Sequence, residues 1–536
     1  KYRIPPTVAE YMDPNQHTAI YCVDQALQSI KSPIPKERTA VILGTGAPGT
    51  HYDNVIRRLN YYKVREKIMN NAKIKSAFAP NELEELIDDI TEKSLEGTLP
   101  ITEDSAPSML QSITAGRICN VFDFRGPAYT VDAACASSLA ASICGVIGLL
   151  RKDYDIAFVG GMEVTMSEIP MVVFSGINAL SPDGSFPFDK RANGFVIGLG
   201  GGVLVLKRLE DALRDKDEIY GIISGFGQGS DGKGKGIAAP NKEGQVRVIE
   251  SSCKMAGYPV ETIEYVEAHG TGTAVGDEVE VEALTEAFLN LGAKRKNYCG
   301  LGSVKSNIGH LRYASGAPGM IKNCLALYNK IIPPTANVEE INPKLRIEDS
   351  PFYIVSEKKK WEGTNWHPRR ANISAYGFGG ADFHICMEEF RSEFVKRVYS
   401  AAMKNTENVN AVSQNKPDKL PEVVLFSGAT IDDIKNGYTN FLQIIEKENK
   451  SIEQGVLINN SLNNAKDNVR LAIVFNSLDE LNDKWDYFNE CIENNKLTSL
   501  NKKGVFFKEG KVINSNEMAW MFPGQSSQYA NMLKEL

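Results

Sequence analysis

Long apolar runs and an excess of positive charge are both missing from this sequence. No continuous apolar stretch approaches the ~20 residues of a membrane span, and the start of the chain has no charged-then-apolar signal segment. The formal net charge is −7, and the lysine runs at 358–360 and 502–503 are too short to form a basic surface. We therefore expect a soluble, cytoplasmic protein that binds no nucleic acid.

Paired cysteines and complete nucleotide-binding motifs are missing too. The nine cysteines are scattered, with no two closer than nine residues apart, which excludes zinc-finger and redox pairs and predicts no metal site. The glycine-rich segment 44–49 is not part of a βαβ unit of the kind that binds dinucleotides. The glycine-rich segment 227–236 lacks the Gly-Lys-Ser/Thr sequence that ends a phosphate-binding loop. We expect no bound cofactor, and most cysteines should be small buried hydrophobic residues.

What is present is the composition of a large globular protein. The 536 residues are 42% hydrophobic and 24% charged, and at ~150 residues a domain they suffice for roughly three to four domains. Residues 1–390 alternate buried strands and helices with glycine turns, which predicts an α/β fold. A surface linker is predicted over 391–420 and a small α/β domain over 421–515, with strands at 423–426, 471–475 and 505–507. Residues 516–536 begin a further domain.

One cysteine has a setting of its own. Cys135 follows the predicted strand 128–133 and precedes a helical pattern over 139–150. A thiol at a helix N-terminus meets unpaired backbone N–H groups and the positive end of the helix dipole, and both favour the thiolate. The sequence therefore predicts that Cys135 is a nucleophile with a lowered pKa.

Two of the six histidines are candidates to act on this thiol. His269 follows the predicted strand 263–266, and His310 lies five residues after Lys305. Because loops at the carboxyl ends of strands build the active sites of α/β sheets, Cys135, His269 and His310 are expected to converge. One base suffices for thiol hydrolysis, whereas two imidazole N–H donors suit the enolate that forms when a malonyl thioester loses carbon dioxide. Lys305 would orient or polarise these groups.

Three segments closely resemble the active-site motifs of the β-ketoacyl synthases. They are 131–139 (Val-Asp-Ala-Ala-Cys-Ala-Ser-Ser-Leu), 267–273 (Glu-Ala-His-Gly-Thr-Gly-Thr) and 302–310 (Gly-Ser-Val-Lys-Ser-Asn-Ile-Gly-His), in the family's order. Further similar segments are 180–184 (Leu-Ser-Pro-Asp-Gly), 186–189 (Phe-Pro-Phe-Asp) and 377–380 (Gly-Phe-Gly-Gly). The resemblance therefore covers nearly all of 1–390.

The resemblance implies a thiolase-like fold, in which two fused βαβαβ halves form α-β-α-β-α layers, usually in a homodimer. Cys135, from the first half, would take an acyl group from an acyl carrier protein. His269 and His310, from the second half, would promote decarboxylation of the malonyl-carrier and steady the enolate, with Lys305 behind His310.

Other positions acquire roles through the same resemblance. Thr271 and Thr273 would hydrogen-bond the phosphopantetheine arm of the carrier. Phe378 would be the aromatic gate beside the nucleophile, and its backbone would help to form the oxyanion hole. His384 matches a histidine that is structural in the family.

The regions outside the motifs resemble parts of a multidomain synthase. The long charged segment 50–107 and the Asp-Ala-Ala-Cys-Ala setting are similar to iterative polyunsaturated fatty-acid synthases and related glycolipid and enediyne synthases. Residues 421–515 resemble the ketosynthase-acyltransferase linker domain, and 522–528 resemble the opening of an acyltransferase, with Gln525 in its oxyanion hole. We expect a piece of a larger synthase, without the family's glycine-rich strand before Pro5 and without the transferase serine motif.

Three positions differ from the family pattern, and two alternative functions are consistent with parts of the sequence. Asn193, Leu199 and Asp382 differ from the family pattern, and Asp382 places a potential charge near the predicted gate. A non-elongating scaffold that binds and passes acyl groups is one alternative, although such domains commonly lose the second histidine, which this chain keeps. A thiolase is the other, and it would use a second cysteine such as Cys386, which instead lies in an apparent buried strand.

Overall fold

The computed structural model divides the chain into two compact units, Lys1–Lys396 and Arg397–Leu536. It describes residues 2–46, 49–165, 167–234, 236–237, 239–392 and 394 of the first unit. In the second unit it describes 422–447, 452, 455–456, 459–460, 467–494, 500 and 504–510. Most of the expected surface linker 391–420, and all of the expected acyltransferase opening 516–536, therefore lie outside the described residues.

The first unit contains a sheet that carries the nucleophile. Its order is β2-β1-β3-β4, where β1 pairs in parallel with β2 and β3, and β3 pairs antiparallel with β4. The central strands β1 and β3 are buried along their whole length, as expected for apolar runs covered on both faces. The strand bounds are β1 Thr39–Gly44, β2 Ala128–Val131, β3 Ile156–Glu163 and β4 Gly200–Lys207.

A second, larger sheet carries the histidines. Its order is β5-β12-β11-β6-β7-β9, with parallel pairing from β11 through β6 and β7 to β9 and antiparallel pairing in the rest. The bounds are β5 Ile222–Ser230, β6 Tyr265–Glu267, β7 Cys299–Gly302, β9 Phe352–Ile354, β11 Arg370–Gly377 and β12 Ala381–Glu388. A separate two-stranded sheet pairs β8 Ile331–Ile332 with β10 Lys359–Lys360.

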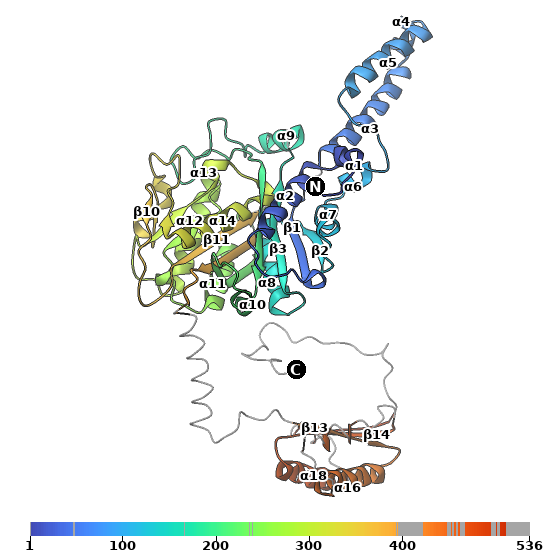
Figure 1. Ribbon diagram of the computed structural model, residues 1–536, viewed down its shortest axis with the longest axis vertical. Helices are drawn as coiled ribbons and strands as arrows, with labels where there is room; N and C mark the ends of the chain where they lie inside the picture. Colours follow the sequence, from blue (N-terminus) through green and yellow to red (C-terminus); the bar gives the residue numbers. More distant parts are fainter. Residues whose placement is uncertain are drawn as a thin grey trace. The chain divides into compact units, whose positions relative to one another are not determined.

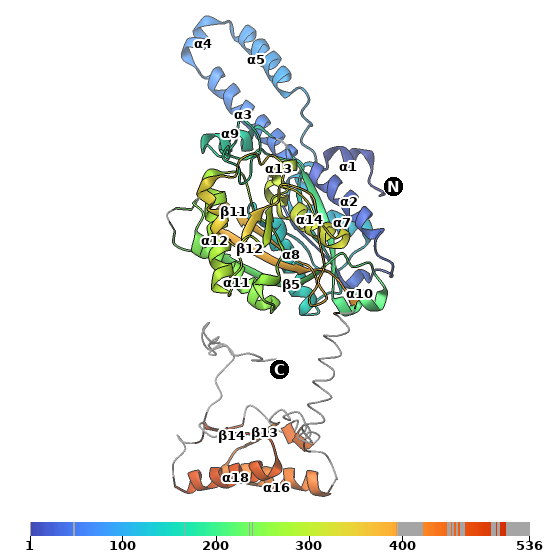
Figure 2. The ribbon, with the colours of Figure 1, turned by 90° about the vertical axis from the view of Figure 1, so that its left-hand side faces the viewer.

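Two helices pack between the sheets. α8 (Ser137–Leu150) contacts β1 and β3 on one side and β12 on the other, and α14 (Gly316–Asn329) contacts β4 and β11 (Figure 2). α2 (Pro14–Leu27) and α7 (Ser112–Phe122) pack against the first sheet, and α11 (Lys242–Ala256) and α12 (Ala274–Asn290) form the layer on the second. This helix-sheet-helix-sheet-helix order is the layered arrangement that the resemblance to the β-ketoacyl synthases implies.

A helical arm projects from the first unit. It consists of α3 (Thr50–Met69), α4 (Ala72–Ala77) and α5 (Pro80–Leu95), and it extends beyond the layered body in both Figure 1 and Figure 2. Leu83 and Ile87 of α5 are buried, and the hydroxyl of Tyr61 on α3 donates to the carbonyl of Ile87 at 3.2 Å. The long charged segment 50–107 therefore contains a helical hairpin. Shorter helices complete the unit: α1 Pro6–Tyr11, α6 Ser105–Met109, α9 Glu168–Gly176, α10 Leu209–Asp215 and α13 Lys305–Ile308.

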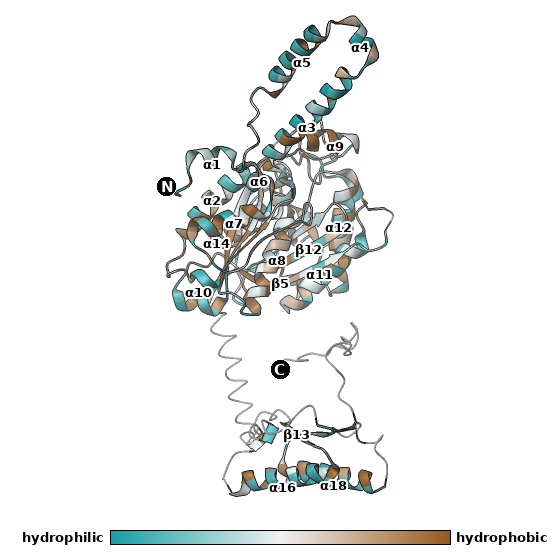
Figure 3. Ribbon diagram, turned by 90° about the vertical axis from the view of Figure 1, so that its right-hand side faces the viewer, coloured by the Kyte–Doolittle hydropathy of each residue, from teal (hydrophilic) through white to brown (hydrophobic). Residues whose placement is uncertain are grey.

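The second unit is a small α/β module. β14 (Val469–Phe475) pairs antiparallel with β13 (Glu422–Gly428) and β15 (Val505–Glu509), which confirms the three predicted strands. α16 (Ile431–Lys447) and α18 (Leu478–Glu493) pack on this sheet, and each is apolar on one side and polar on the other (Figure 3). The apolar sides meet the strands in one core that includes Phe441, Leu471 and Phe488.

Among the helices of the described residues, none has both the length and the apolar content required to cross a membrane.

Candidate active site

Cys135 lies in a tight turn between β2 and α8. Ala134, just before it, has a left-handed backbone (φ 49°), which is uncommon for a residue with a side chain. The hydroxyl of Ser137 holds the turn, since it accepts from the N–H of Ala133 at 2.8 Å and donates to the carbonyl of Ala134 at 2.6 Å. The turn places Cys135 directly before the first turn of α8, as the sequence predicts.

The hairpin between β11 and β12 contacts this turn. A Cβ on Gly377 would lie 2.3 Å from the carbonyl oxygen of Ala133, so glycine is required for the two backbones to approach this closely. The next residue, Phe378, is 52% exposed. Its backbone N–H and the N–H of Cys135 both act on the thiol and oppose the rise of its pKa. Two N–H groups therefore lie near the sulfur, close to where an acyl-transfer oxyanion would form.

The pKa of Cys135 differs from the sequence prediction. Burial raises the pKa above the ordinary thiol value, and this effect exceeds the opposing contributions of the Phe378 N–H and of the charges on Lys305 and Arg312. The prediction of a lowered pKa is therefore wrong, because the helix terminus that favours the thiolate lies in the interior, where removal from water disfavours it.

His310 is a buried, neutral hydrogen-bond donor. The residue lies just after α13 in the chain and is 2% exposed. Burial, followed by the charges of Lys305 and Arg312, holds the pKa of the ring well below its usual value. Nδ1 accepts from the backbone N–H of Arg312 at 3.1 Å. A neutral imidazole that accepts at Nδ1 carries its proton on Nε2, so His310 has an N–H to offer.

His269 lies beside His310, as expected. It follows β6, and the two imidazole rings are 5.5 Å apart between centroids and meet edge to face at 84°. Burial, with smaller contributions from Lys305 and His310, also holds the pKa of His269 well below its usual value. Its Nδ1 is buried and has no hydrogen-bond partner among the described residues. The site thus contains two neutral imidazoles, one with a polar atom that no described group satisfies.

The side chain of Lys305 is hydrogen-bonded to the main chain of His269. The lysine is 4% exposed, and its ammonium donates to the main-chain carbonyl of His269 at 2.5 Å. Burial lowers its pKa, while nearby carboxyl groups of Glu267 and Glu280 favour the charged form. The charge of Lys305 acts on both histidines and on Cys135.

Two buried carboxyl groups on α12 shape the His269 loop. Glu280 accepts from the N–H groups of His269 at 2.7 Å and Gly270 at 2.8 Å, and Asp277 accepts from the N–H of Gly272 at 3.1 Å. Burial raises the pKa of Glu280 to about 7 and that of Asp277 to about 6. The sequence analysis missed the role of Glu280, although the i, i+3 spacing of these two acids places them on one face of a helix that begins next to the loop.

The two threonines of the same loop are neighbours. The hydroxyls of Thr271 and Thr273 are 3.0 Å apart, and Thr271 is 8% exposed. The loop that carries His269 therefore also presents a pair of hydroxyl groups.

Hydrogen bonds between the start of α8 and the start of α14 connect the nucleophile to the segment after His310. The hydroxyl of Ser315 donates to the carbonyl of Cys135 at 2.7 Å. The hydroxyl of Ser138 on α8 accepts from Gly316 at 2.9 Å and from Ala317 at 3.0 Å, at the start of α14. Sequence reasoning missed Ser315, which lies five residues after His310 and carries no charge to mark it.

The three departures from the family pattern lie in different settings. Asn193 is exposed and donates to Asp183 at 2.8 Å, and Leu199 is 41% exposed. Asp382 is 1% exposed, and its carboxyl lies beside that of Asp231, next to the hairpin between β11 and β12. Burial and the neighbouring acid raise the pKa of Asp382 to about 8. Burial and the neighbouring carboxyl therefore favour the protonated form of Asp382 over the charge expected from the sequence.

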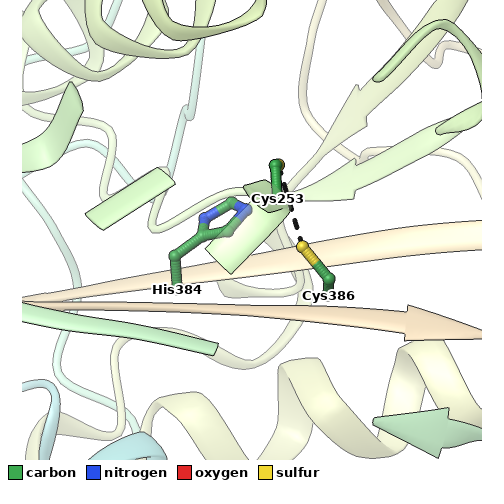
Figure 4. Close-up of side chains that lie close together, drawn as sticks. All are labelled: Cys253, His384 and Cys386. Carbon is green, nitrogen blue, oxygen red and sulfur yellow. Dashed lines mark hydrogen bonds between the residues drawn. The ribbon is translucent and has the colours of Figure 1, made fainter. Parts of the chain in front are cut away.

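Cys386 lies in a buried cluster that consists of structural side chains. Its sulfur is 3.8 Å from that of Cys253 on α11, and His384 is beside them (Figure 4). Both ring nitrogens of His384 are engaged, with Asn372 and Ser374, each at 2.9 Å. Cys253, His384 and Cys386 are the one group of potential metal ligands found in the described part of the chain. Because the imidazole is already satisfied and the group lies between β12 and α11, it is best explained as packing.

The site therefore combines a cysteine at a helix N-terminus, two backbone N–H groups near its sulfur and two neutral histidines. Residues 2–212 match the model of the β-ketoacyl synthase N-terminal domain, and residues 220–339 match that of the β-ketoacyl synthase C-terminal domain. The chain therefore belongs to the β-ketoacyl synthase family, and its layered fold is the thiolase-like fold of ketosynthases.

Its relatives are polyketide synthases. The chain is 42% identical over 283 residues to polyketide synthase PksL of Bacillus subtilis, a match that takes in 53% of this chain and 6% of the relative. It is 36% identical over 309 residues to polyketide synthase PksN of the same organism, with coverage of 55% of this chain and 6% of that protein. The chain thus spans a small part of the length of these relatives.

Solved structures agree with the family. The ketosynthase from module 6 of the bacillaene synthase of Bacillus subtilis superposes with a TM-score of 0.61 and 27% sequence identity. That match covers 95% of this chain and 76% of the other. The likeness identifies a ketosynthase domain of the kind found in polyketide synthases.

Proposed function

We propose that residues 1–390 catalyse a decarboxylative Claisen condensation between an acyl chain on Cys135 and a malonyl group on an acyl carrier protein. The observation that carries this proposal is the pairing of His269 and His310 as neutral rings 5.5 Å apart, with the proton of His310 on Nε2. Two neutral imidazoles suit a reaction in which negative charge develops on a thioester oxygen.

The first half-reaction transfers the acyl group. The sulfur of Cys135 attacks the thioester carbonyl, the bond to the carrier sulfur breaks, and the carrier thiol leaves with the proton from Cys135. The tetrahedral oxyanion accepts from the N–H groups of Cys135 and Phe378, which already act on the sulfur. The raised pKa of Cys135 favours a thiol that ionises when substrate arrives.

The second half-reaction forms the carbon–carbon bond. The malonyl-carrier loses carbon dioxide, and the resulting enolate oxygen accepts from His269 and from Nε2–H of His310. The enolate carbon then attacks the acyl carbonyl on Cys135, and the sulfur departs as the leaving group. Lys305 holds the main chain of His269 and supplies a positive charge near both rings.

Carrier recognition and assembly are part of the same proposal. Thr271 and Thr273 would hydrogen-bond the phosphopantetheine arm, and the exposed ring of Phe378 would gate the route to Cys135. Edge strand β2, whose Tyr129 is 40% exposed, offers unpaired backbone for a homodimer. We further propose that 421–515 joins this domain to an adjoining acyltransferase in an iterative lipid or polyketide synthase.

Acyl loading followed by mass spectrometry tests the proposal. Incubation with an acyl-carrier should add one acyl group to the protein, and Cys135→Ala should abolish the adduct. Cys386→Ala, in the buried cluster, serves as the matched control and should be acylated normally. An unchanged adduct in Cys135→Ala would exclude the proposed nucleophile. Acylation of the wild type without carbon dioxide release from malonyl-carrier would favour the non-elongating scaffold instead.

A further inference from the structure

Behind His310 lies a buried ion pair that the proposed chemistry does not use. Nη2 of Arg312 donates to Oε1 of Glu163 at 2.8 Å and to the carbonyl of Thr165 at 3.2 Å. The two charged side chains are 5% and 1% exposed, respectively. The pair joins the two halves of the fold, because Glu163 ends β3 of the first sheet whereas Arg312 belongs to the loop that carries His310.

The same arginine holds the ring of His310 through its backbone. Its N–H is the donor to Nδ1 of His310, at 3.1 Å. Arg312 makes this bond from a left-handed conformation (φ 45°), which costs free energy for a residue with a side chain. A strained turn of this kind persists where surrounding contacts impose it.

Close packing shows where this constraint comes from. Arg312 opens a short 3₁₀ turn, Arg312–Ala314, that rests on the end of β3. A Cβ on Gly161 would lie 2.9 Å from the Cα of Ala314 and 2.8 Å from the Cβ of Ser138. The turn after His310, the strand of Glu163 and the helix that follows Cys135 therefore meet at one point.

The ion pair is incompletely satisfied, which argues against stability as its main role. Oε2 of Glu163 and Nε of Arg312 are buried without partners among the described residues. Burial raises the pKa of Glu163 to about 7 even though the arginine opposes this. A buried ion pair with unmet hydrogen bonds is often no more stable than an apolar replacement, so its value here is geometric.

We propose that the Glu163–Arg312 ion pair is a positioning device that fixes the turn after His310 and thereby keeps the ring as the Nε2–H tautomer. This inference rests on the proposed function, in which Nε2–H stabilises the enolate. Its consequence is selective, since decarboxylation needs that tautomer whereas acyl transfer to Cys135 does not.

The test compares two half-reactions in the full chain. Glu163→Gln keeps the shape of the side chain at 163 and leaves the charge of Arg312 in place. Arg312→Lys keeps the positive charge but loses the planar guanidinium group with its several N–H donors. The matched control is Glu389→Gln, which alters another buried ion pair, Arg369–Glu389 at 2.8 Å, between the residue before β11 and the residue after β12. Acylation of Cys135 is followed by mass spectrometry, and decarboxylation by carbon dioxide release from malonyl-carrier.

We expect both site variants to acylate at the wild-type rate but to decarboxylate more slowly, by of the order of a hundredfold, as a displaced catalytic group does. The loss should appear in kcat and not in KM for malonyl-carrier. Two-bond ¹H–¹⁵N spectra of labelled histidine, with His310→Ala for assignment, should show the Nε2–H form in the wild type and a mixture in Glu163→Gln. Glu389→Gln should match the wild type in all three measurements.

Three results would overturn the inference: wild-type decarboxylation in both variants, an equal loss in both half-reactions, or the same loss in Glu389→Gln. If Glu163→Gln fails to fold, Arg312→Lys decides by the same criteria. A different result would contradict the proposed function itself. That result is a normal rate of decarboxylation in His310→Ala, independent of how the ion-pair variants behave.

Discussion

The main-chain N–H of Arg312 donates to Nδ1 of His310 at 3.1 Å, and this bond determines which ring nitrogen carries the proton. A histidine held in this way is a donor and not a base while the ring is neutral. The low pKa of the buried ring keeps it neutral across the physiological range. The chemistry that we expect from His310 follows from these two facts.

Replacing His310 by residues with and without a donor tests this role. His310→Ala removes one of two N–H groups at the enolate and should slow decarboxylation about a hundredfold to a thousandfold. His310→Asn retains an N–H group and should lose less. Initial rates of carbon dioxide release from malonyl-carrier measure both variants. Equal losses in the two would show that the donor is not what matters.

The alkylation of Cys135 should follow the raised pKa of its thiol. Since only the thiolate reacts, the rate of modification by iodoacetamide should keep rising as the pH increases from 7 to 9. A thiol with the lowered pKa predicted from the helix N-terminus would instead reach its plateau near pH 7. Site-specific peptide mass spectrometry separates Cys135 from the other eight cysteines.

Removing the charge of Lys305 should affect the nucleophile and His269 together. Lys305→Met loses the hydrogen bond to the His269 carbonyl and a charge that opposes the rise of the Cys135 pKa. We therefore expect slower decarboxylation and an alkylation profile displaced to higher pH. Lys296→Met is a control, because its ion pair with Asp349 lies at the surface. An unchanged alkylation profile in Lys305→Met would contradict the electrostatic part of this account.

The threonine pair should contribute to carrier binding. Thr271→Val and Thr273→Val each remove one hydrogen bond that we assign to the phosphopantetheine arm, worth about 0.5–1.5 kcal/mol. KM for malonyl-carrier should rise about twofold to tenfold, with little change in kcat. Iodoacetamide, which has no such arm, should modify Cys135 at the wild-type rate. A fall in kcat alone would place the threonines in a different role.

Asp382 should make stability depend on pH. Its folded-state pKa of about 8 lies above the unfolded value of ~3.9, so the folded state holds more protons between these values and loses stability as the pH rises through them. Asp382→Asn cannot titrate and should gain stability relative to the wild type from pH 5 to pH 8. Urea unfolding midpoints at pH 5, 6.5 and 8 measure the effect, with exposed Asp349→Asn as control. A constant difference between Asp382→Asn and the wild type would contradict the raised pKa.

Sequence patterns predicted the parts of the fold that depend on local regularity. The apolar run in β1, the helix after Cys135 and the three strands of the second unit each have a period or composition that fixes their type. Cys135, His269 and His310 could be identified because each lies in a short motif. Their convergence followed from the general position of active sites at strand ends.

What could not be predicted depends on contacts between distant segments. Glu280 acts on His269 from the second turn of α12, and Arg312, which donates to His310, is paired with Glu163 at the end of a strand of the other sheet. The pKa of Cys135 was mispredicted for the same reason. A helix terminus can be inferred from a local pattern, but the burial that opposes its effect arises from packing of the two sheets.

Single-turnover condensation on pre-acylated protein tests the central claim most directly. The Cys135 adduct is isolated, malonyl-carrier is added, and the adduct, carbon dioxide and carrier products are followed together by mass spectrometry. We predict that the adduct disappears as carbon dioxide and β-ketoacyl-carrier appear in equal amounts. Persistence of the adduct on Cys135 while malonyl-carrier remains intact would contradict the assignment of an elongating ketosynthase.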